Sequence, residues 1–440
     1  MRLSGLVALA ILCLAVPPTL GDDWPQWLGP NRDSVWRETG IVDRFPQRGL
    51  RVQWRAPVEL GYAAPAVAGG RVFVMDYRLR AGEVTNNAGG ADRLEGTERV
   101  LCLDAGTGQL RWKYEYDRPY RFSFGGGPRC TPTVDGAMVY ALGAEGNLSC
   151  LETQTGRLVW VKNFVKDYGA ATPFWGVAAH PLVDGDLLFC VVGGPGSVAV
   201  AFDKRTGREV WRALSAEQQG YCPPTMIEIG GRKQLIIWHG ESINGLDPPT
   251  GRVYWSVPLK PNVGMAITTP RQFGPYLLAT GYGDVGVLLK LAADQSAAEV
   301  VWRGGAKNAV YCANSTPFLE DGTIYGCDIG SGALMGVRLT DGKRLWQTLQ
   351  PTTGATRRGR YGTAFIVKHE DRFFLFSETG DLILAQLSPQ GYTEIDRFRM
   401  LQPTNKVFGR DVIWSHPAFA DRSVFARNDK ELVRVSLAAE

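Results

Sequence analysis

Residues Leu103–Trp112 read Leu-Asp-Ala-Gly-Thr-Gly-Gln-Leu-Arg-Trp, with an Asp and a Thr-Gly pair ahead of a Trp. The Asp side chain can accept backbone N–H bonds within a tight turn, and Gly takes the positive φ that other residues resist. An apolar strand therefore ends at the Asp, the chain turns over Thr-Gly, and the next strand carries the Trp. We expect a β-hairpin that places one Trp at a fixed position in a sheet.

The pattern returns along the whole chain, which indicates a repeat architecture. Each repeat predicts a first strand after a loop, a Gly- or Asp-rich turn, a second strand, and then the quoted hairpin. Eight first strands and eight of these turns can be counted. The other copies of the hairpin, some of them shortened, lengthened or degenerate, are Leu151–Trp160, Phe202–Trp211, Leu246–Trp255, Leu291–Trp302, Arg338–Trp346 and Leu387–Phe398.

The eighth repeat lacks a fourth strand at the C-terminus, where Leu432–Leu437 supplies only a third strand. A matching strand lies at the other end of the chain, in Leu50–Val58, with Trp54 in the repeated position. An N-terminal strand that completes the last sheet closes a ring and leaves no open edge. The sequence predicts an all-β, eight-bladed β-propeller of four-stranded antiparallel blades, closed by strand 50–58.

The N-terminus predicts export. Arg2 precedes the apolar run Leu6–Val16, and small residues before Asp22 suit cleavage there. The run is short for a transmembrane span, so we expect a signal peptide at 1–21, a leader segment at 22–49, a propeller at 50–440 and no transmembrane segment. The location would be periplasmic or extracellular, with a lipid anchor at Cys13 as the alternative. A net charge of +4 gives no support for a nucleic-acid partner.

Seven cysteines remain after the predicted cleavage, an odd number that leaves at least one of them unpaired within the monomer. Most occupy equivalent repeat positions, which favours small buried side chains on the sheets. Cys312 and Cys327 face each other across a predicted hairpin. Whether they form a disulfide stays open at this point.

The Asp-x-x-Thr-Gly-x-x-x-Trp pattern resembles the tryptophan-docking repeat of pyrroloquinoline-quinone (PQQ)-like propellers, over essentially the whole mature chain. Similar repeats build quinoprotein alcohol dehydrogenases and the propeller lipoprotein of the outer-membrane β-barrel assembly machinery. The leader Asp23–Gly40 (DWPQWLGPNRDSVWRETG) is similar to that of exported PQQ-like propellers from planctomycete-type bacteria. The resemblance implies the eight-bladed fold strongly and a function only weakly.

In a propeller of this kind, the loops entering the first strands gather on one face around the central channel. Aromatic and basic side chains there suit a planar or anionic ligand. The alternative is structural: Tyr and His satisfy the loop backbone while Arg and Lys are solvated. The predicted ligand-binding face comprises Tyr62, Arg129, Phe174, Trp175, Tyr221, Lys307, Tyr311, Asn314, Arg360, Tyr361, Arg410 and Trp414.

Two loop insertions and two histidines are further candidates for binding. The insertion Tyr77–Arg99 enlarges a turn of the first blade, and a solvated flexible loop is at least as plausible there as a binding loop. The insertion Asp167–Gly176 is the better candidate for a contact, because it exposes Phe174 and Trp175. His180 and His416 occupy equivalent positions in blades three and eight, where packing is favoured over a shared metal. No metal site is predicted.

The family's cofactor would need a carboxylate and an Asn on Ca²⁺, an Asp base near the quinone, and a vicinal cysteine pair. The chain has no vicinal cysteines, and Asp411 is the one carboxylate among the candidate residues of the entering loops. The favoured function is therefore an exported, non-catalytic propeller that binds a protein or cell-envelope ligand through its loop-bearing face, without a cofactor. The alternative is a PQQ-dependent alcohol or sugar dehydrogenase with Ca²⁺, Asp411 as base, and Arg360 or Arg410 near the quinone.

Overall fold

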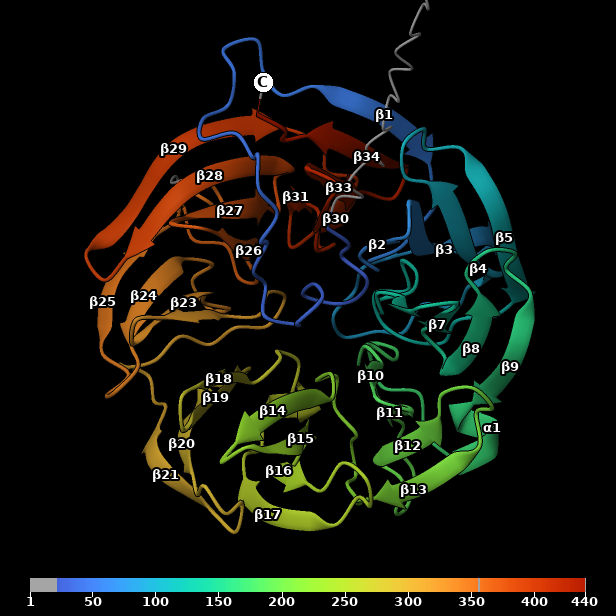
Figure 1. The fold of residues 1–440 in the computed structure, drawn as a ribbon, viewed down its shortest axis with the longest axis vertical. Helices are drawn as coiled ribbons and strands as arrows, with labels where there is room; N and C mark the ends of the chain where they lie inside the picture. The colour runs from blue at the N-terminus through green and yellow to red at the C-terminus, as the bar shows by residue number, and fades with distance from the viewer. Residues whose placement is uncertain (1–21, 355–356, 440) are drawn as a thin grey trace, which may run out of the picture.

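The computed structural model describes residues 22–354 and 357–439, and these form a ring of eight four-stranded antiparallel sheets (Figure 1). The predicted eight-bladed propeller is confirmed. In each blade the first strand is innermost and the fourth strand lies at the rim, in the order that the repeated hairpins impose. The predicted signal peptide, residues 1–21, lies outside the described part of the chain.

Blades 1 to 4 follow one another along the chain, and each takes four consecutive strands. Blade 1 is β2 (Ala66–Ala68), β3 (Arg71–Ala81), β4 (Glu95–Asp104) and β5 (Leu110–Asp117). Blade 2 is β6 (Thr133–Asp135), β7 (Met138–Leu142), β8 (Asn147–Glu152) and β9 (Leu158–Asn163). Blade 3 is β10 (Leu182–Asp184), β11 (Leu187–Val191), β12 (Ala199–Asp203) and β13 (Glu209–Ala213). Blade 4 is β14 (Thr225–Ile229), β15 (Arg232–Trp238), β16 (Ser242–Leu246) and β17 (Val253–Pro258).

Blades 5 to 7 repeat this arrangement, and blade 8 joins the two ends of the chain. Blade 5 is β18 (Arg271–Phe273), β19 (Tyr276–Gly281), β20 (Val285–Leu291) and β21 (Ala298–Arg303). Blade 6 is β22 (Phe318–Glu320), β23 (Thr323–Cys327), β24 (Leu334–Arg338) and β25 (Arg344–Thr348). Blade 7 is β26 (Ala364–His369), β27 (Arg372–Ser377), β28 (Asp381–Ser388) and β29 (Gly391–Arg399). Blade 8 is β32 (Ala418–Ala420), β33 (Ser423–Arg427), β34 (Glu431–Ser436) and the N-terminal β1 (Val52–Pro57).

Blade 8 closes the ring as the sequence predicts. Strand β1 pairs antiparallel with β34, with Trp54 opposite Arg434. Because the last blade contains strands from both ends of the chain, the first and last blades cannot separate without breaking this ladder.

Three elements lie outside the blades. The helix α1 (Phe164–Tyr168) follows blade 2, and a 3₁₀ turn (Asn262–Gly264) follows blade 4. The hairpin β30 (Asn405–Val407) and β31 (Arg410–Val412) lies between blades 7 and 8 and was not predicted.

Six of the repeated tryptophans connect their blade with the next one, whereas Trp255 of blade 4 donates to Gln234 Oε1 of its own blade at 3.0 Å. Trp160 of blade 2 donates its indole N–H to the Lys204 carbonyl of blade 3, at 3.2 Å. Gly207 has a φ of +71°, and a Cβ there would lie 2.7 Å from the Trp160 ring, so glycine is required. The same carbonyl contact is made by Trp54 to Ala105, Trp112 to Thr153, Trp211 to Pro248, Trp302 to Leu339 and Trp346 to Ser388.

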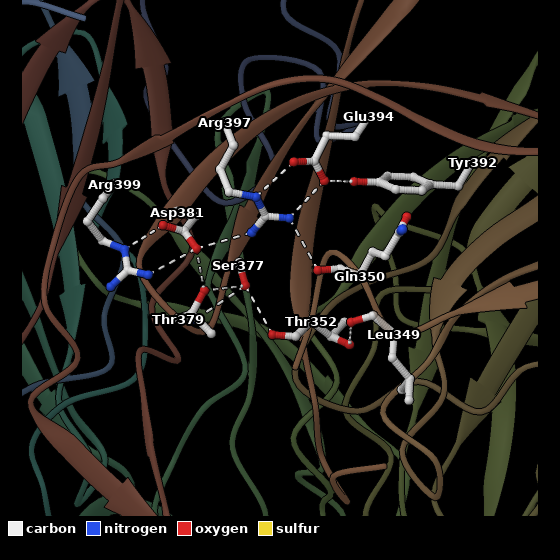
Figure 2. Close-up of polar contacts among 10 residues, drawn as sticks. All are labelled: Leu349, Gln350, Thr352, Ser377, Thr379, Asp381, Tyr392, Glu394, Arg397 and Arg399. Atoms are coloured by element: carbon white, nitrogen blue, oxygen red, sulfur yellow. Dashed lines mark hydrogen bonds and ion pairs between the residues drawn. The ribbon is translucent and has the colours of Figure 1, made fainter. Parts of the chain in front are cut away.

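Blade 7 replaces the tryptophan with charged side chains. The β-bulge that follows the Trp pair in the other blades lies between Leu384 and Ala385, so Asp396 takes the Trp position instead of the predicted Phe398. Figure 2 shows Arg397 and Arg399 of β29 converging on Asp381. Arg397 also donates to the Gln350 carbonyl of the preceding loop at 3.2 Å. The ion pairs lie within blade 7, and the Arg397 hydrogen bond connects them with the loop that follows blade 6.

The leader crosses the ring, and Figure 1 shows it in dark blue running between the rim and the centre. Trp24 pairs with Val67 in blade 1, and Val35 pairs with Lys368 in blade 7. The Asp23 carboxylate accepts from the Gly69 N–H in the turn after β2. The leader therefore lies at the end of the channel opposite the loop-bearing face.

Buried arginines hold the leader in the channel. The Arg32 guanidinium donates to the carbonyl groups of Pro181, at 3.0 Å, and Pro224, at 3.4 Å. In return, Arg271 donates to the carbonyl groups of Arg32, at 3.0 Å, and Asp33, at 2.6 Å. Since these contacts reach blades 3, 4 and 5, the leader is fixed to several innermost strands at once.

Cys312 and Cys327 are free thiols, as are the other five cysteines of the described chain, and all seven are buried. Burial raises the pKa of the Cys327 thiol to about 12, so it stays protonated at neutral pH. The disulfide left open by the sequence does not form in this structure. The cysteines pack as small apolar side chains, as their repeat positions favour.

Candidate functional site

The loop-bearing face carries a cavity of about 220 Å³ at the centre of the ring. Its walls come from the loops that precede the first strands, and its floor comes from the leader. Apolar and aromatic side chains dominate the lining. The lining residues are Trp27, Tyr62, Ala88, Phe124, Arg129, Trp175, Ala178, His180, Tyr221, Pro223, Met265, Ile267, Thr268, Ala313, Asn314, Thr316, Tyr361, Phe365, Phe408, Trp414 and His416.

Trp27 forms the floor. Its ring stacks on His180 with centroids 4.1 Å apart and planes at 14°, and meets His416 edge-on at 5.0 Å. The indole N–H donates to Thr269 Oγ1 at 3.1 Å. One leader side chain therefore contacts blades 3, 5 and 8 and closes the cavity toward the opposite face.

The two histidines beside Trp27 are neutral and oriented. His180 Nδ1 accepts from the Thr131 N–H at 2.8 Å, which places the ring proton on Nε2. His416 Nδ1 lies 2.5 Å from the Pro417 carbonyl, a contact that requires the proton on Nδ1. Burial lowers the pKa of His416 to about 4, and burial with the nearby Arg32 charge lowers the pKa of His180. The packing predicted for both is confirmed.

The cavity thus has one imidazole donor, His180 Nε2–H, and one imidazole acceptor, His416 Nε2. Within residues 22–354 and 357–439, neither Nε2 atom has a protein hydrogen-bond partner. Both histidines line the cavity. They offer a ligand two neutral hydrogen-bonding groups next to the Trp27 ring.

Aromatic rings form a nearly continuous wall on one side. Phe124 lies 6.2 Å from Trp414, Trp414 lies 6.4 Å from Tyr361, and Tyr361 stacks on Phe408 at 5.3 Å, all between ring centroids. On the other side, Trp175 lies 5.8 Å from Tyr221. Such surfaces offer apolar contact and ring stacking with few mobile torsions.

Three of these aromatic residues hold a left-handed backbone. The φ angles are +54° for Phe124, +61° for Tyr361 and +50° for Phe408. This conformation costs about 1–2 kcal/mol for an L-residue other than Gly, Asn or Asp. All three line the same cavity, so the backbone strain that lowers the stability of the fold also places these rings in the cavity wall.

The first-blade insertion and the hairpin β30–β31 meet over Tyr62. Asn405 donates to Tyr62 Oη at 2.8 Å, and Asn86 donates to Asn405 Oδ1 at 2.5 Å. Ala88 of the insertion lines the cavity. The insertion, for which a solvated flexible loop was at least as plausible, therefore contributes to the wall.

Among the described lining residues, Arg129 is the one cation. It donates to the carbonyl groups of Gly127, Ser123 and Phe124, and its guanidinium lies 5.1 Å from the Tyr62 ring centroid. No described carboxylate forms an ion pair with it. Burial lowers the pKa of Arg129 from its ordinary value, although it remains a cation at neutral pH. The cavity therefore holds a positive charge without an anionic partner.

The structure brings most of the predicted face together. The predicted residues that line the cavity are Tyr62, Arg129, Trp175, Tyr221, Asn314, Tyr361 and Trp414. Phe174 lies outside the lining, 45% exposed and edge-on to Trp175. Arg360 lies over the Tyr361 ring, and Arg410 pairs with Glu378 behind the wall.

Two further predicted residues lie outside the lining, as Phe174, Arg360 and Arg410 do. The Tyr311 ring is buried under the loop. Its hydroxyl donates to the Gly305 carbonyl at 2.7 Å. Lys307 is exposed but outside the lining. Conversely, sequence reasoning missed Trp27, Phe124 and Phe408. Only Phe408 had a local signal, the Phe-Gly pair that turns the hairpin.

The lining offers poor ligands for PQQ with Ca²⁺. Calcium prefers several oxygen ligands that include carboxylates, and none of the described lining residues is Asp or Glu. Asp411 is exposed on β31, opposite Lys406, and lies outside the lining. Glu378, a buried carboxylate behind the wall, accepts from Trp414 Nε1 at 3.1 Å and from Arg410 Nε at 2.7 Å. These residues do not assemble the site that the dehydrogenase alternative requires.

Within residues 22–354 and 357–439, no three His, Cys, Asp or Glu side chains gather in a group that could hold a metal ion. No helix there is long and apolar enough to cross a membrane.

Solved structures with the same fold include two kinds of protein. BamB from Moraxella catarrhalis is similar with a TM-score of 0.58 and 14% identity, over 89% of this chain and 98% of that one. The quinohemoprotein alcohol dehydrogenase from Comamonas testosteroni is similar with a TM-score of 0.61 and 11% identity, over 95% of this chain and 81% of that one. At such low identity the likeness shows the fold alone.

Sequence comparison finds a curated relative and a family. The serine/threonine-protein kinase AfsK of Streptomyces griseus is 27% identical over 214 residues, 48% of this chain, and the match covers only 21% of the kinase. The family model described as outer membrane protein assembly factor BamB matches residues 96–348 and 239–438. Together these matches run from blade 1 to blade 8, so the chain belongs to the PQQ-like propeller family of the outer membrane protein assembly factor BamB.

Proposed function

We propose that this protein is an exported, non-catalytic propeller that binds a protein of the cell envelope through its loop-bearing face. The observation that carries the proposal is the aromatic cavity at the centre of that face, which has one unpaired cation and no carboxylate in its described lining. Phe408 in the lining and Phe174 beside it are both exposed and enlarge the apolar surface of this face. Apolar and aromatic anchors surrounded by polar groups are typical of protein interfaces.

The family supports a protein ligand. Its description names an outer membrane protein assembly factor, and such a factor acts on or with other proteins. Export is proposed from the signal-peptide pattern at residues 1–21 and agrees with that description.

Site-specific photo-crosslinking tests the proposal. A benzoylphenylalanine in place of Phe174 or Phe408 should give a discrete adduct with an envelope protein in the producing cells. The same probe at Leu110, which is 56% exposed on the rim strand β5, is the matched control and should give none. Absence of adducts from both loop-face positions, or equal adducts from Leu110, would contradict the proposal.

The second candidate is the PQQ-dependent alcohol or sugar dehydrogenase. It is favoured by the flat Trp27 ring and by Arg129, which suit a planar anion, and opposed by the carboxylate-free lining. A ligand of the native state raises the melting temperature by mass action. No shift with PQQ and Ca²⁺, together with no dye reduction on a panel of alcohols and sugars, would remove this candidate.

A further inference from the structure

We infer that the bound partner presents an acidic segment, from which one aromatic or large aliphatic side chain enters the cavity and packs on Trp27. This inference rests on the proposed function, and it specifies the partner's chemistry and adds the leader to the binding site. It is carried by two independent observations, the closed aromatic cavity and a set of unpaired cations around it.

The cavity suits a single side chain. Trp27, His180 and His416 close it from below, so a ligand can enter only from the loop-bearing face. The walls are rings that are held in place, some at the cost of backbone strain. A rigid, pre-formed apolar cavity favours one anchor residue of a partner, since few protein torsions need to be fixed on binding.

The charge around the mouth is unbalanced on the side of blades 6 to 8. Arg357 and Arg358 are exposed and form no ion pair with any described residue. Arg360 is also exposed, and the contacts of its guanidinium with described residues are to neutral groups, the Tyr282 hydroxyl at 3.3 Å and the Tyr361 ring. On the same side Arg410 is neutralised by the buried Glu378. The 357–360 loop therefore presents charge that the protein itself does not use.

The hairpin next to this loop carries side chains of both positive and negative charge. Lys406 is exposed on β30, and Asp411 is exposed opposite it on β31. Neither forms an ion pair within the described chain. The hairpin is thus close to neutral, and the excess of positive charge comes from the 357–360 loop and from Arg129.

Two separated cationic sites favour an extended segment over a small anion. Arg129 lies in the loop between blades 1 and 2, whereas the 357–360 loop lies between blades 6 and 7. A small anion can meet one of these sites, but an extended chain that crosses the cavity can place carboxylates on both. Complementary charge of this kind speeds association and fixes the direction in which the segment lies.

Fluorescence anisotropy on the full chain tests the inference. The probe is a fluorescein-labelled peptide with one Phe between two runs of three Glu. We expect it to bind, and to bind about tenfold or more weakly when Phe is replaced by Ser or when Glu is replaced by Gln. Binding should also weaken as salt is raised, because the charges on the rim are exposed.

Protein variants locate the two contacts. Trp27→Ala and the double variant Arg357→Glu/Arg358→Glu should each weaken binding of the Glu–Phe–Glu peptide about tenfold. Trp27→Phe keeps an aromatic floor and should bind within about threefold of wild type. The matched charge reversal Arg205→Glu/Arg208→Glu, on a turn of blade 3 away from the cavity, should not change binding.

Several results would overturn the inference. Equal binding of Lys-rich and Glu-rich peptides would overturn it. So would an unchanged affinity of the Arg357→Glu/Arg358→Glu variant, or full competition by PQQ alone. If Trp27→Ala does not fold, the Phe→Ser peptide and Trp27→Phe still decide whether an anchor occupies the floor. Failure of every peptide while Phe174 and Phe408 still crosslink an envelope protein would reject the acidic segment and leave the proposed function standing. Failure of every peptide together with loss of the crosslinks would reject the acidic segment and the proposed function alike.

Discussion

The indole of Trp27 stacks on the imidazole of His180, with centroids 4.1 Å apart and planes at 14°. Residue 27 belongs to the leader and residue 180 to the loop before blade 3, so this contact joins the leader to the ring. Trp27→Ala removes the stack and the hydrogen bond to Thr269. For a half-buried Trp we expect a loss of about 2 kcal/mol in the free energy of unfolding. Urea unfolding followed by circular dichroism measures this loss, and a midpoint unchanged from wild type would show that the leader is not anchored there.

Acid should weaken the cavity floor. The folded pKa of His416 is about 4, below the ordinary value near 6.5, so the unfolded state takes up a proton first as pH falls. The stability contributed by neutral His416 is therefore present above about pH 6.5 and is lost as pH falls toward about 4. His180, whose pKa is also lowered by burial and Arg32, acts in the same direction.

The variant His416→Gln does not titrate and isolates this effect. Between pH 7 and 4.5, the drop in its unfolding free energy should be about 2 kcal/mol smaller than in wild type. An equal drop in the two proteins would mean that His416 is protonated in the folded state or does not titrate differently on unfolding.

The docking of Trp160 on Gly207 should be sensitive to a single methyl group. A Cβ at position 207 would lie 2.7 Å from the Trp160 ring, whereas a Cβ at Gly231 would meet nothing within 4 Å. Both glycines have a φ of +71°, so both substitutions carry the same backbone strain. We expect Gly207→Ala to cost about 1–3 kcal/mol more than Gly231→Ala in urea unfolding. Equal costs would show that the ring contact is unimportant.

Asp381 should stabilise blade 7 at neutral pH. Burial opposes its ionisation, but hydrogen bonds from Arg399 and Thr379 outweigh burial and lower its pKa below the ordinary value. Its contribution is therefore present above about pH 4 and is lost as pH falls through the lowered folded pKa.

The variant Asp381→Asn should lose about 2 kcal/mol at pH 7, and the difference from wild type should shrink in acid. Glu95→Gln, which removes an exposed ion pair with Arg121, is the control and should cost less than about 1 kcal/mol. If both variants were equally stable at pH 7, the network in Figure 2 would contribute nothing measurable to the rim.

The blades could be predicted from sequence because the repeat carries its own geometry. The Asp104 carboxylate accepts from both the backbone N–H and the hydroxyl of Thr107, at 2.8 and 3.0 Å, so the turn is specified within a few residues. Trp112 then follows at a fixed offset. The position of Asp396 could not be predicted, because it depends on a bulge in the pairing of β28 with β29 that leaves no local signal.

The site was predicted in part, for a related reason. Tyr62, Trp175 and Tyr361 precede first strands, and the propeller topology places all such loops around one channel. Trp27 could not be placed, because its contacts are with residues more than 150 positions away and the leader has no strand period. The hairpin Asn405–Val412 escaped prediction because its strands have three residues each.

Fluorine NMR of 5-fluorotryptophan-labelled protein shows whether a bound peptide contacts Trp27. The Trp27 resonance is assigned by its loss in Trp27→Phe, and that of Trp36, a leader residue buried away from the cavity, by its loss in Trp36→Phe. When the Glu–Phe–Glu peptide is added to saturation, the Trp27 resonance should shift and the Trp36 resonance should not. A Trp27 resonance that stays in place while the peptide is fully bound would contradict a binding site built on the leader.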